Sequence, residues 1–196
     1  VLFRSWKPQN YDGSTGGLTT LREGLRKSMN LISVRMVQED FAPSEQVKRT
    51  AQRMGISTDI RAVDALALGT SEVYPIEMVS AYAAYANKGV YSQPFAITRI
   101  EDRYGNVIKE YFPQQKEVLS EETAYLMTSL MQTVMDRGTG GSARWKYKFN
   151  RPAAGKTGTT QGWSDAWFVG FTPQITAGCW FGVDDFRVPL GPGQDG

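Results

Sequence analysis

Two short motifs contain the side chains in this sequence that are best suited to chemistry. The first is Ser28-Met29-Asn30, and the second, Lys156-Thr157-Gly158-Thr159, starts 128 residues after that serine. If the second motif is a strand, its two threonines project to one side, and its lysine and glycine project to the other. Two hydroxyl donors beside an ammonium suit the carboxylate at the end of a peptide chain. The glycine leaves room for an extended peptide to pair with the strand edge.

The composition limits how such a site could move protons. The 196 residues include no histidine and one cysteine, which excludes Ser-His-Asp and Cys-His catalysis and every histidine metal site. Proton transfer near neutral pH would therefore fall to a lysine, a carboxylate or a tyrosine, and we expect no cofactor and no metal. The net charge of +2 gives no strong electrostatic reason to expect nucleic acid or a membrane surface as a partner.

Hydrophobic periodicity predicts mostly helices early in the chain and strands at its end. Two residues of Ser28-Met29-Asn30 compete for backbone hydrogen bonds, so we expect this motif to break a helical pattern over 19–40. The order of elements indicates one α+β domain rather than a parallel array. The other predicted elements are helices over 44–54 (capped by Ser44), 75–87 and 120–137, a hairpin over 95–112, and strands over 145–149, 156–160, 166–171 and 175–183.

Three other features have a simpler interpretation than a functional one. A phosphate-binding loop at Gly155-Lys156-Thr157 would need a glycine at 150, where the chain has Asn150, so we reject it. The alternating aromatic and basic residues over 144–151 could stack single-stranded nucleic acid, but the low net charge favours a half-buried strand with its lysines in water. Cys179 lies in a predicted apolar strand, where we expect a small buried side chain.

Together, the two motifs resemble the second and third active-site motifs of the penicillin-recognising serine acyltransferases. Their surroundings are similar to the penicillin-binding proteins, and within these to the bifunctional class A type. The resemblance covers the chain from about Trp6 to Gly196. The stretches that carry it, besides the two motifs, are Trp6-Lys7-Pro8-Gln9-Asn10-Tyr11-Asp12-Gly13, Thr20-Leu21-Arg22-Glu23, Leu68-Gly69-Thr70-Ser71-Glu72-Val73, Arg137-Gly138-Thr139-Gly140, Asp165-Ala166-Trp167-Phe168-Val169-Gly170-Phe171-Thr172-Pro173 and Trp180-Phe181-Gly182.

This resemblance implies a fold and an activity. The implied fold is an antiparallel sheet with helices on both faces and a helical subdomain, here incomplete. The implied activity is a D,D-transpeptidase that cross-links peptidoglycan through an acyl-enzyme. Its partners would be stem peptides, whose D-Ala-D-Ala ends enter the pocket, and β-lactams, which imitate those ends. The implied location is the extracytoplasmic (periplasmic) face of the bacterial cytoplasmic membrane.

The resemblance also implies a role for each motif residue. Ser28 relays a proton to the leaving amine, Lys156 holds that hydroxyl in a positive field, and Asn30 binds the substrate amide and orients the catalytic lysine. Thr157 and Thr159 hold the substrate carboxylate, and the Thr159 backbone N–H gives half of the oxyanion hole, a donor worth ~3 kcal/mol. The simpler alternatives are helix capping for Ser28 and Asn30 and a solvated surface cation for Lys156.

One part of the family's pattern is absent. The family's nucleophile lies in a Ser-x-x-Lys motif, and no serine of this chain has lysine three positions later; Ser5-Trp6-Lys7 has the wrong spacing. Because the chain starts at Val1 and ends in loop-like sequence, we expect residues 1–196 to be a partial transpeptidase domain. The expected missing parts are the nucleophile, a membrane anchor, a glycosyltransferase domain and a closing C-terminal helix. The isolated chain should then be inactive and poorly stable.

Two other hypotheses remain open. A non-catalytic module could keep the carboxylate-binding residues and bind D-Ala-D-Ala or β-lactams without ever having a nucleophile. Sequence upstream of residue 1 decides between this module and the enzyme, because only the enzyme needs Ser-x-x-Lys there. An unrelated α+β structural protein is the third hypothesis, and it predicts that no D-Ala-D-Ala peptide protects Lys156.

Overall fold

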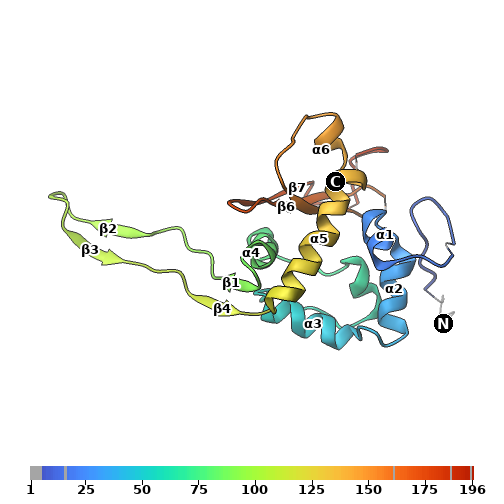
Figure 1. Ribbon diagram of the computed structural model, residues 1–196, viewed down its shortest axis with the longest axis horizontal. Coiled ribbons are helices and arrows are strands. Elements are labelled where there is room, and N and C mark those ends of the chain that lie inside the picture. Colours follow the sequence, from blue (N-terminus) through green and yellow to red (C-terminus); the bar gives the residue numbers. More distant parts are fainter. Residues whose placement is uncertain (1–5, 16, 161, 186, 195) are drawn as a thin grey trace.

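The computed structural model describes residues 6–15, 17–160, 162–185, 187–194 and 196 (Figure 1). Ser5, the serine nearest to a Ser-x-x-Lys spacing, lies outside these residues. The described residues form a mixed helix and sheet fold. Its elements are α1 (Leu21–Arg26), α2 (Asn30–Gln38), α3 (Ser44–Arg53), η1 (Asp64–Leu68), α4 (Pro75–Ala86), β1 (Val90–Ser92), β2 (Arg99–Glu101), β3 (Val107–Glu110), β4 (Gln115–Glu117), α5 (Glu121–Arg137), α6 (Ser142–Trp145), β5 (Ala154–Thr159), β6 (Asp165–Phe171) and β7 (Thr176–Gly182).

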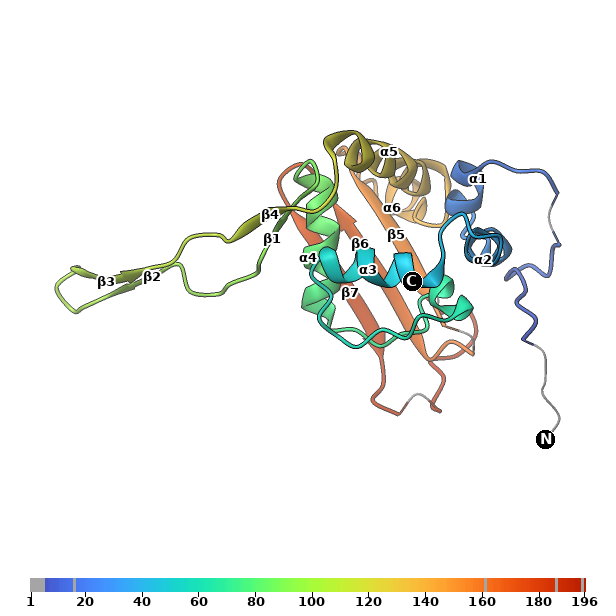
Figure 2. The same cartoon turned by 90° about the horizontal axis from the view of Figure 1, so that it is seen from below.

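The C-terminal strands form an antiparallel sheet in the order β5-β6-β7 (Figure 2). Within the described residues β5 pairs with β6 alone, so its other edge is unpaired. Lys156 stands opposite Val169 and Thr157 opposite Phe168 in the register. This places the Lys-Thr-Gly-Thr motif along the unpaired edge of the sheet.

Helices α4 and α5 cover one face of this sheet, and Figure 1 shows the short α6 on its other side. Met131 of α5 packs with Ala154 of β5 and Phe171 of β6, and Leu25 of α1 joins this cluster. The apolar side chains therefore fix α1 and α5 relative to the strand that contains Lys156. A second cluster, between α4 and the segment after α3, consists of Met54, Ile56, Ile60, Ala81, Ala84 and Val118.

Most of the predicted elements are confirmed, including the interruption of the first helix. Helices α1 and α2 are separated at Ser28, whose backbone is left-handed (φ 53°). Helix α3 begins at Ser44, but its N-cap is Pro43, so the predicted cap lies one residue late. The hairpin over 95–112 and the three C-terminal strands are present.

Two predictions from alternation are wrong. Residues 145–149 do not form a strand: α6 ends at Trp145, Lys148 adopts φ 57°, and the Arg144 guanidinium donates to the Phe149 carbonyl (2.7 Å). Trp145 and Tyr147 are exposed, so the alternating aromatic side chains do not pack against a hydrophobic core. Cys179 is also exposed, because β7 is an edge strand whose outer face no described element covers.

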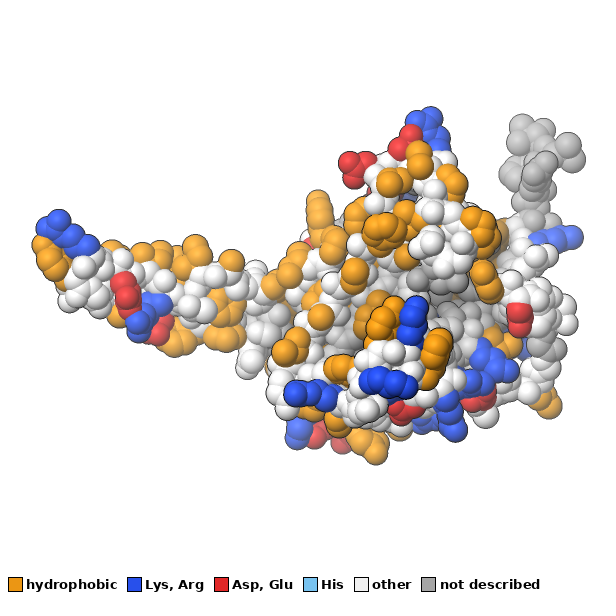
Figure 3. All heavy atoms as spheres, turned by 90° about the horizontal axis from the view of Figure 1, so that it is seen from above, with side chains coloured by type: hydrophobic (Ala, Val, Ile, Leu, Met, Phe, Trp, Pro, Cys, Tyr) orange, Lys and Arg blue, Asp and Glu red, His pale blue; other side chains and the backbone are white. Residues whose placement is uncertain are grey.

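The β2–β3 hairpin projects from the body as a two-stranded arm (Figures 1 and 2). Its tip is closed by the Asp102 carboxylate, which accepts hydrogen bonds from the backbone N–H groups of Tyr104 and Asn106. Figure 3 shows hydrophobic side chains along the arm. The exposed apolar residues there are Phe95, Ile97, Ile100, Tyr104, Val107, Ile108, Tyr111 and Phe112.

None of the described helices is long and apolar enough to cross a membrane.

Shortening the arm should leave the body intact. None of residues 94–113 belongs to either apolar cluster, and Gln93 already pairs with Gln114 (N···O 3.0 Å). We expect that an Asn-Gly turn in place of 94–113 changes the free energy of unfolding by less than ~1 kcal/mol. Urea titration followed by far-UV circular dichroism measures this. A loss of several kcal/mol would show that the arm supports the fold.

Candidate active site

The two motifs meet in the structure although 128 residues separate them. Lys156 Nζ donates a hydrogen bond of 2.7 Å to Ser28 Oγ, and a second one of 2.8 Å to the carbonyl oxygen of Thr157. Strand β5 supplies the lysine, and the turn between α1 and α2 supplies the serine. The simple capping and surface-cation interpretations do not require this contact.

Burial changes the acidity of this lysine. Desolvation lowers the pKa of the Lys156 ammonium from 10.5 to about 8, because the charged form loses water. No ion pair among the described residues includes Lys156. At pH 7 roughly nine in ten copies therefore remain protonated, while the proton is far easier to remove than from a surface lysine.

The turn before α2 puts the Ser28 side chain in place. A left-handed backbone (φ 53°) is uncommon for a residue with a Cβ, so the surrounding structure must hold it. Two backbone hydrogen bonds do so: Ser28 N–H donates to the Leu25 carbonyl (3.1 Å), and Met29 N–H donates to the Gly24 carbonyl (2.8 Å). The turn thus closes back onto α1, and the position of α1 determines where the Ser28 hydroxyl lies.

Asn30, the last residue of the first motif, bonds to the segment before α1. Its Nδ2 donates to the Gln9 carbonyl (2.9 Å). The neighbouring Asn10 is buried and its Oδ1 accepts from the Leu31 N–H (3.0 Å), which caps the start of α2. Asn10 stands 21 residues before Leu31, and no spacing in the sequence indicates this contact.

The strand residues after Lys156 each have a neighbour. Thr157 Oγ1 lies 2.7 Å from Thr139 Oγ1, and Thr159 Oγ1 accepts from the Gly196 N–H at 3.2 Å. A Cβ added at Gly158 would lie 3.3 Å from the Trp167 Cβ, so this position favours glycine because of the adjacent strand. The contact of Thr139 with Thr157 joins the end of α5 to strand β5 across 18 residues, so it could not be predicted from local sequence spacing.

Together these contacts place a hydroxyl, a partly desolvated ammonium and two threonine hydroxyls at the free edge of a sheet. Such a group can supply protons without imidazole and can bind an anionic peptide end. Within the described part of the chain, no three His, Cys, Asp or Glu side chains are grouped to hold a metal ion.

Comparison with known proteins gives one consistent family. The family model "Penicillin binding protein transpeptidase domain" matches residues 1–183. Penicillin-binding protein 1A of Aquifex aeolicus is 38% identical over 179 residues, which is 91% of this chain and 24% of that protein. Penicillin-binding protein 2D of Bacillus subtilis is 36% identical over 186 residues, 92% of this chain and 26% of that protein. The chain thus spans about a quarter of the length of these relatives.

The fold comparison agrees. The crystal structure of penicillin-binding protein 1A from Haemophilus influenzae superposes with a TM-score of 0.90 at 28% identity, covering 97% of this chain and 34% of that one. This match confirms the expected α+β fold with an antiparallel sheet. The chain belongs to the penicillin-binding protein transpeptidase domain family.

Proposed function

We propose that this chain is the proton-relay and carboxylate-binding part of a peptidoglycan D,D-transpeptidase, within a bifunctional class A penicillin-binding protein. The observation that carries the proposal is the 2.7 Å hydrogen bond from Lys156 Nζ to Ser28 Oγ. Its substrates are peptidoglycan stem peptides, and its inhibitors are β-lactams. The whole protein acts at the extracytoplasmic face of the membrane, where a further segment anchors it and a glycosyltransferase domain makes the glycan strands.

In the first step a serine outside residues 1–196 attacks the carbonyl carbon of the penultimate D-Ala. An ester bond forms, the amide C–N bond breaks, and the departing amine must gain one proton. Ser28 gives its hydroxyl proton to that amine, and Lys156 replaces it across their 2.7 Å hydrogen bond. The attacking serine loses its proton to the lysine of its own Ser-x-x-Lys motif, and Lys156 regains a proton from water while that lysine gives one up, so the number of protons is unchanged. With a β-lactam the same step opens the ring, and the amine stays attached to the acyl group.

Strand β5 holds the substrate during this step. The hydroxyls of Thr157 and Thr159 bind its terminal carboxylate, and the contact of Thr157 with Thr139 fixes the rotamer of the first. The peptide lies along the unpaired edge of β5, where the Thr159 N–H contributes one oxyanion donor worth about 3 kcal/mol. Asn30 binds the substrate amide and orients the catalytic lysine only after its side chain leaves the Gln9 carbonyl.

The missing Ser-x-x-Lys motif favours a second candidate. If the whole protein also lacks the motif, this domain binds D-Ala-D-Ala ends or β-lactams without chemistry. The same carboxylate-binding residues serve both functions, so only the nucleophile separates them.

Labelling with a fluorescent penicillin tests the proposal. We expect the full-length protein to become covalently labelled, and residues 1–196 alone to remain unlabelled, because a covalent acyl-enzyme needs the serine nucleophile. Gel fluorescence after denaturation measures both. Labelling of residues 1–196 would contradict the assignment of the nucleophile to another segment, and an unlabelled full-length protein that still binds penicillin reversibly would favour the binding module.

The rate of labelling should also depend on the charge of Lys156. The pKa of this ammonium is about 8, so we expect the acylation rate of the full-length protein to fall as the pH rises through 8 and the positive charge is lost. Lys156→Arg keeps its charge throughout this range, so its slower reaction should continue undiminished above pH 9. Stopped-flow fluorescence from pH 6 to 10 measures both profiles. Superimposable profiles would contradict the role of this charge.

A further inference from the structure

The position of Ser28 depends on α1, a helix that is too short to be stable on its own. Helix α1 has six residues, and isolated helices of this length are unstable in water. The backbone bonds of Ser28 and Met29 go to residues of α1, so any movement of α1 moves the Ser28 hydroxyl. The contacts of α1 with the rest of the domain must therefore set the geometry of the site.

Two arginines one turn apart join α1 to α5. The Arg22 guanidinium donates to the Ser129 carbonyl (2.7 Å) and to Thr133 Oγ1 (2.8 Å). Arg26 donates to the Arg137 carbonyl (2.6 Å). Residues 129, 133 and 137 follow at intervals of four and share one face of α5. Arg22 thus fixes the start of α1, and Arg26 fixes the end next to Ser28.

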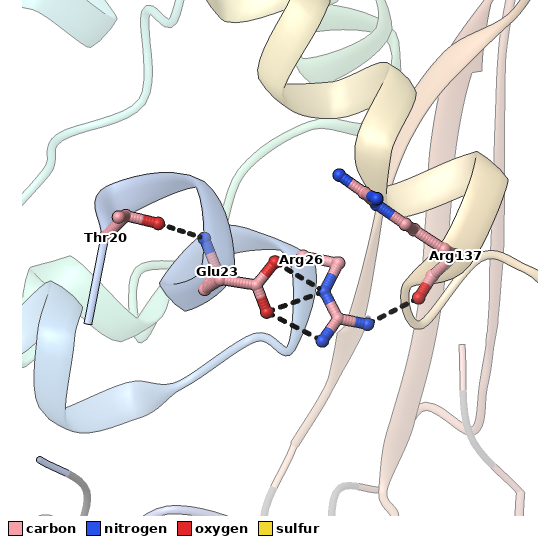
Figure 4. Close-up of polar contacts among 4 residues, drawn as sticks. All are labelled: Thr20, Glu23, Arg26 and Arg137. Carbon is pink, nitrogen blue, oxygen red and sulfur yellow. Dashed lines mark hydrogen bonds and ion pairs between the residues drawn. The ribbon is translucent and has the colours of Figure 1, made fainter.

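Arg26 is held in a planar arrangement that leaves it little freedom (Figure 4). Its Nε donates to both carboxylate oxygens of Glu23 (3.0 Å each), and its Nη2 donates to Oε2 (2.7 Å). This guanidinium lowers the pKa of the Glu23 carboxyl, which stays charged. Thr20 caps the same helix by accepting the Glu23 N–H (3.2 Å). The remaining Nη1 is then aimed at the Arg137 carbonyl, one of the acceptors that the end of α5 leaves without a helical partner.

The backbone next to the contact between Arg26 and Arg137 is connected to strand β5 through Thr139. Thr139 N–H donates to the Arg26 carbonyl (3.2 Å), and a Cβ added at Gly138 would lie only 2.5 Å from that oxygen. Thr139 Oγ1 in turn lies 2.7 Å from Thr157 Oγ1, beside Lys156. The end of α1, the end of α5 and strand β5 therefore form a closed set of contacts around the Ser28–Lys156 pair.

We propose that Arg26 is a positioning residue: by joining Glu23 to the Arg137 carbonyl, it holds the α1–α2 turn where the Ser28 hydroxyl meets Lys156. This inference rests on the transpeptidase function proposed above. Arg26 touches no reacting atom and acts only through the turn. A shift of about 1 Å in a catalytic group can cost on the order of 100-fold in rate. The loss of the Arg26 contact should therefore lower the rate of the chemical step.

The test uses full-length protein and a fluorescent penicillin, with the limiting acylation rate and the half-saturating concentration measured separately. We expect Arg26→Ala to lower the limiting rate about 10- to 100-fold and to change the half-saturating concentration less than about threefold, since the carboxylate-binding threonines remain. Arg26→Lys keeps the charge but not the planar fork, so its rate should fall between those of Arg26→Ala and the unsubstituted protein. The matched control is Arg35→Ala, which removes an exposed ion pair of α2 with Glu39 and should leave both constants within twofold.

A limiting rate of Arg26→Ala within twofold of the unsubstituted protein would overturn the proposal. If Arg26→Ala does not fold, the same criterion applies to Arg26→Lys. Amide hydrogen exchange gives a readout that does not depend on penicillin: the Met29 N–H, bonded to the Gly24 carbonyl, should exchange about tenfold faster in the variant. Unchanged exchange overturns the positioning role, while faster exchange in a protein that penicillin never labels refutes only the proposed function.

Discussion

The hydrogen bond between Lys156 and Ser28 is the contact on which the proposed chemistry depends. The ammonium has lost much of its water, and none of the ion pairs in the described part of the chain gives it a carboxylate. Its pKa of about 8 corresponds to a cost of about 3 kcal/mol for the charged form. Two oxygen acceptors, Ser28 Oγ and the Thr157 carbonyl, offset part of that cost. A chain without histidine thereby obtains a group that can be charged or neutral near neutral pH.

The rest of the fold can be understood as the means of bringing these two side chains together. The apolar cluster of Met131, Ala154 and Phe171 fixes α5 on the sheet. It thereby fixes the position of α5 relative to strand β5, which contains Lys156. The polar contacts of Arg22 and Arg26 attach α1 to the same helix. Apolar burial thus determines the position of Lys156, and directional hydrogen bonds determine the position of Ser28.

The sequence predicted those parts of the structure whose cause is local. Competition for backbone hydrogen bonds at Ser28-Met29-Asn30 predicted the helix break, and the local pattern over 95–112 predicted the hairpin. Alternation failed at 145–149 and at Cys179, because a period of two identifies a buried face only where another element covers it. The partners of Asn30, Arg26 and Thr139 were beyond reach, since each contact joins segments that only the tertiary fold brings together.

The most direct test of this account is a double-mutant cycle on Ser28→Ala and Lys156→Met, read as the acylation rate of the full-length protein by a fluorescent penicillin. If the two side chains act as one relay, the double variant should be no slower than the slower single variant. The reason is that either single substitution already abolishes the relay. If the fold-reductions in acylation rate of the two single variants instead multiply in the double variant, the two residues act independently. That result would contradict the central claim even if each single variant were impaired.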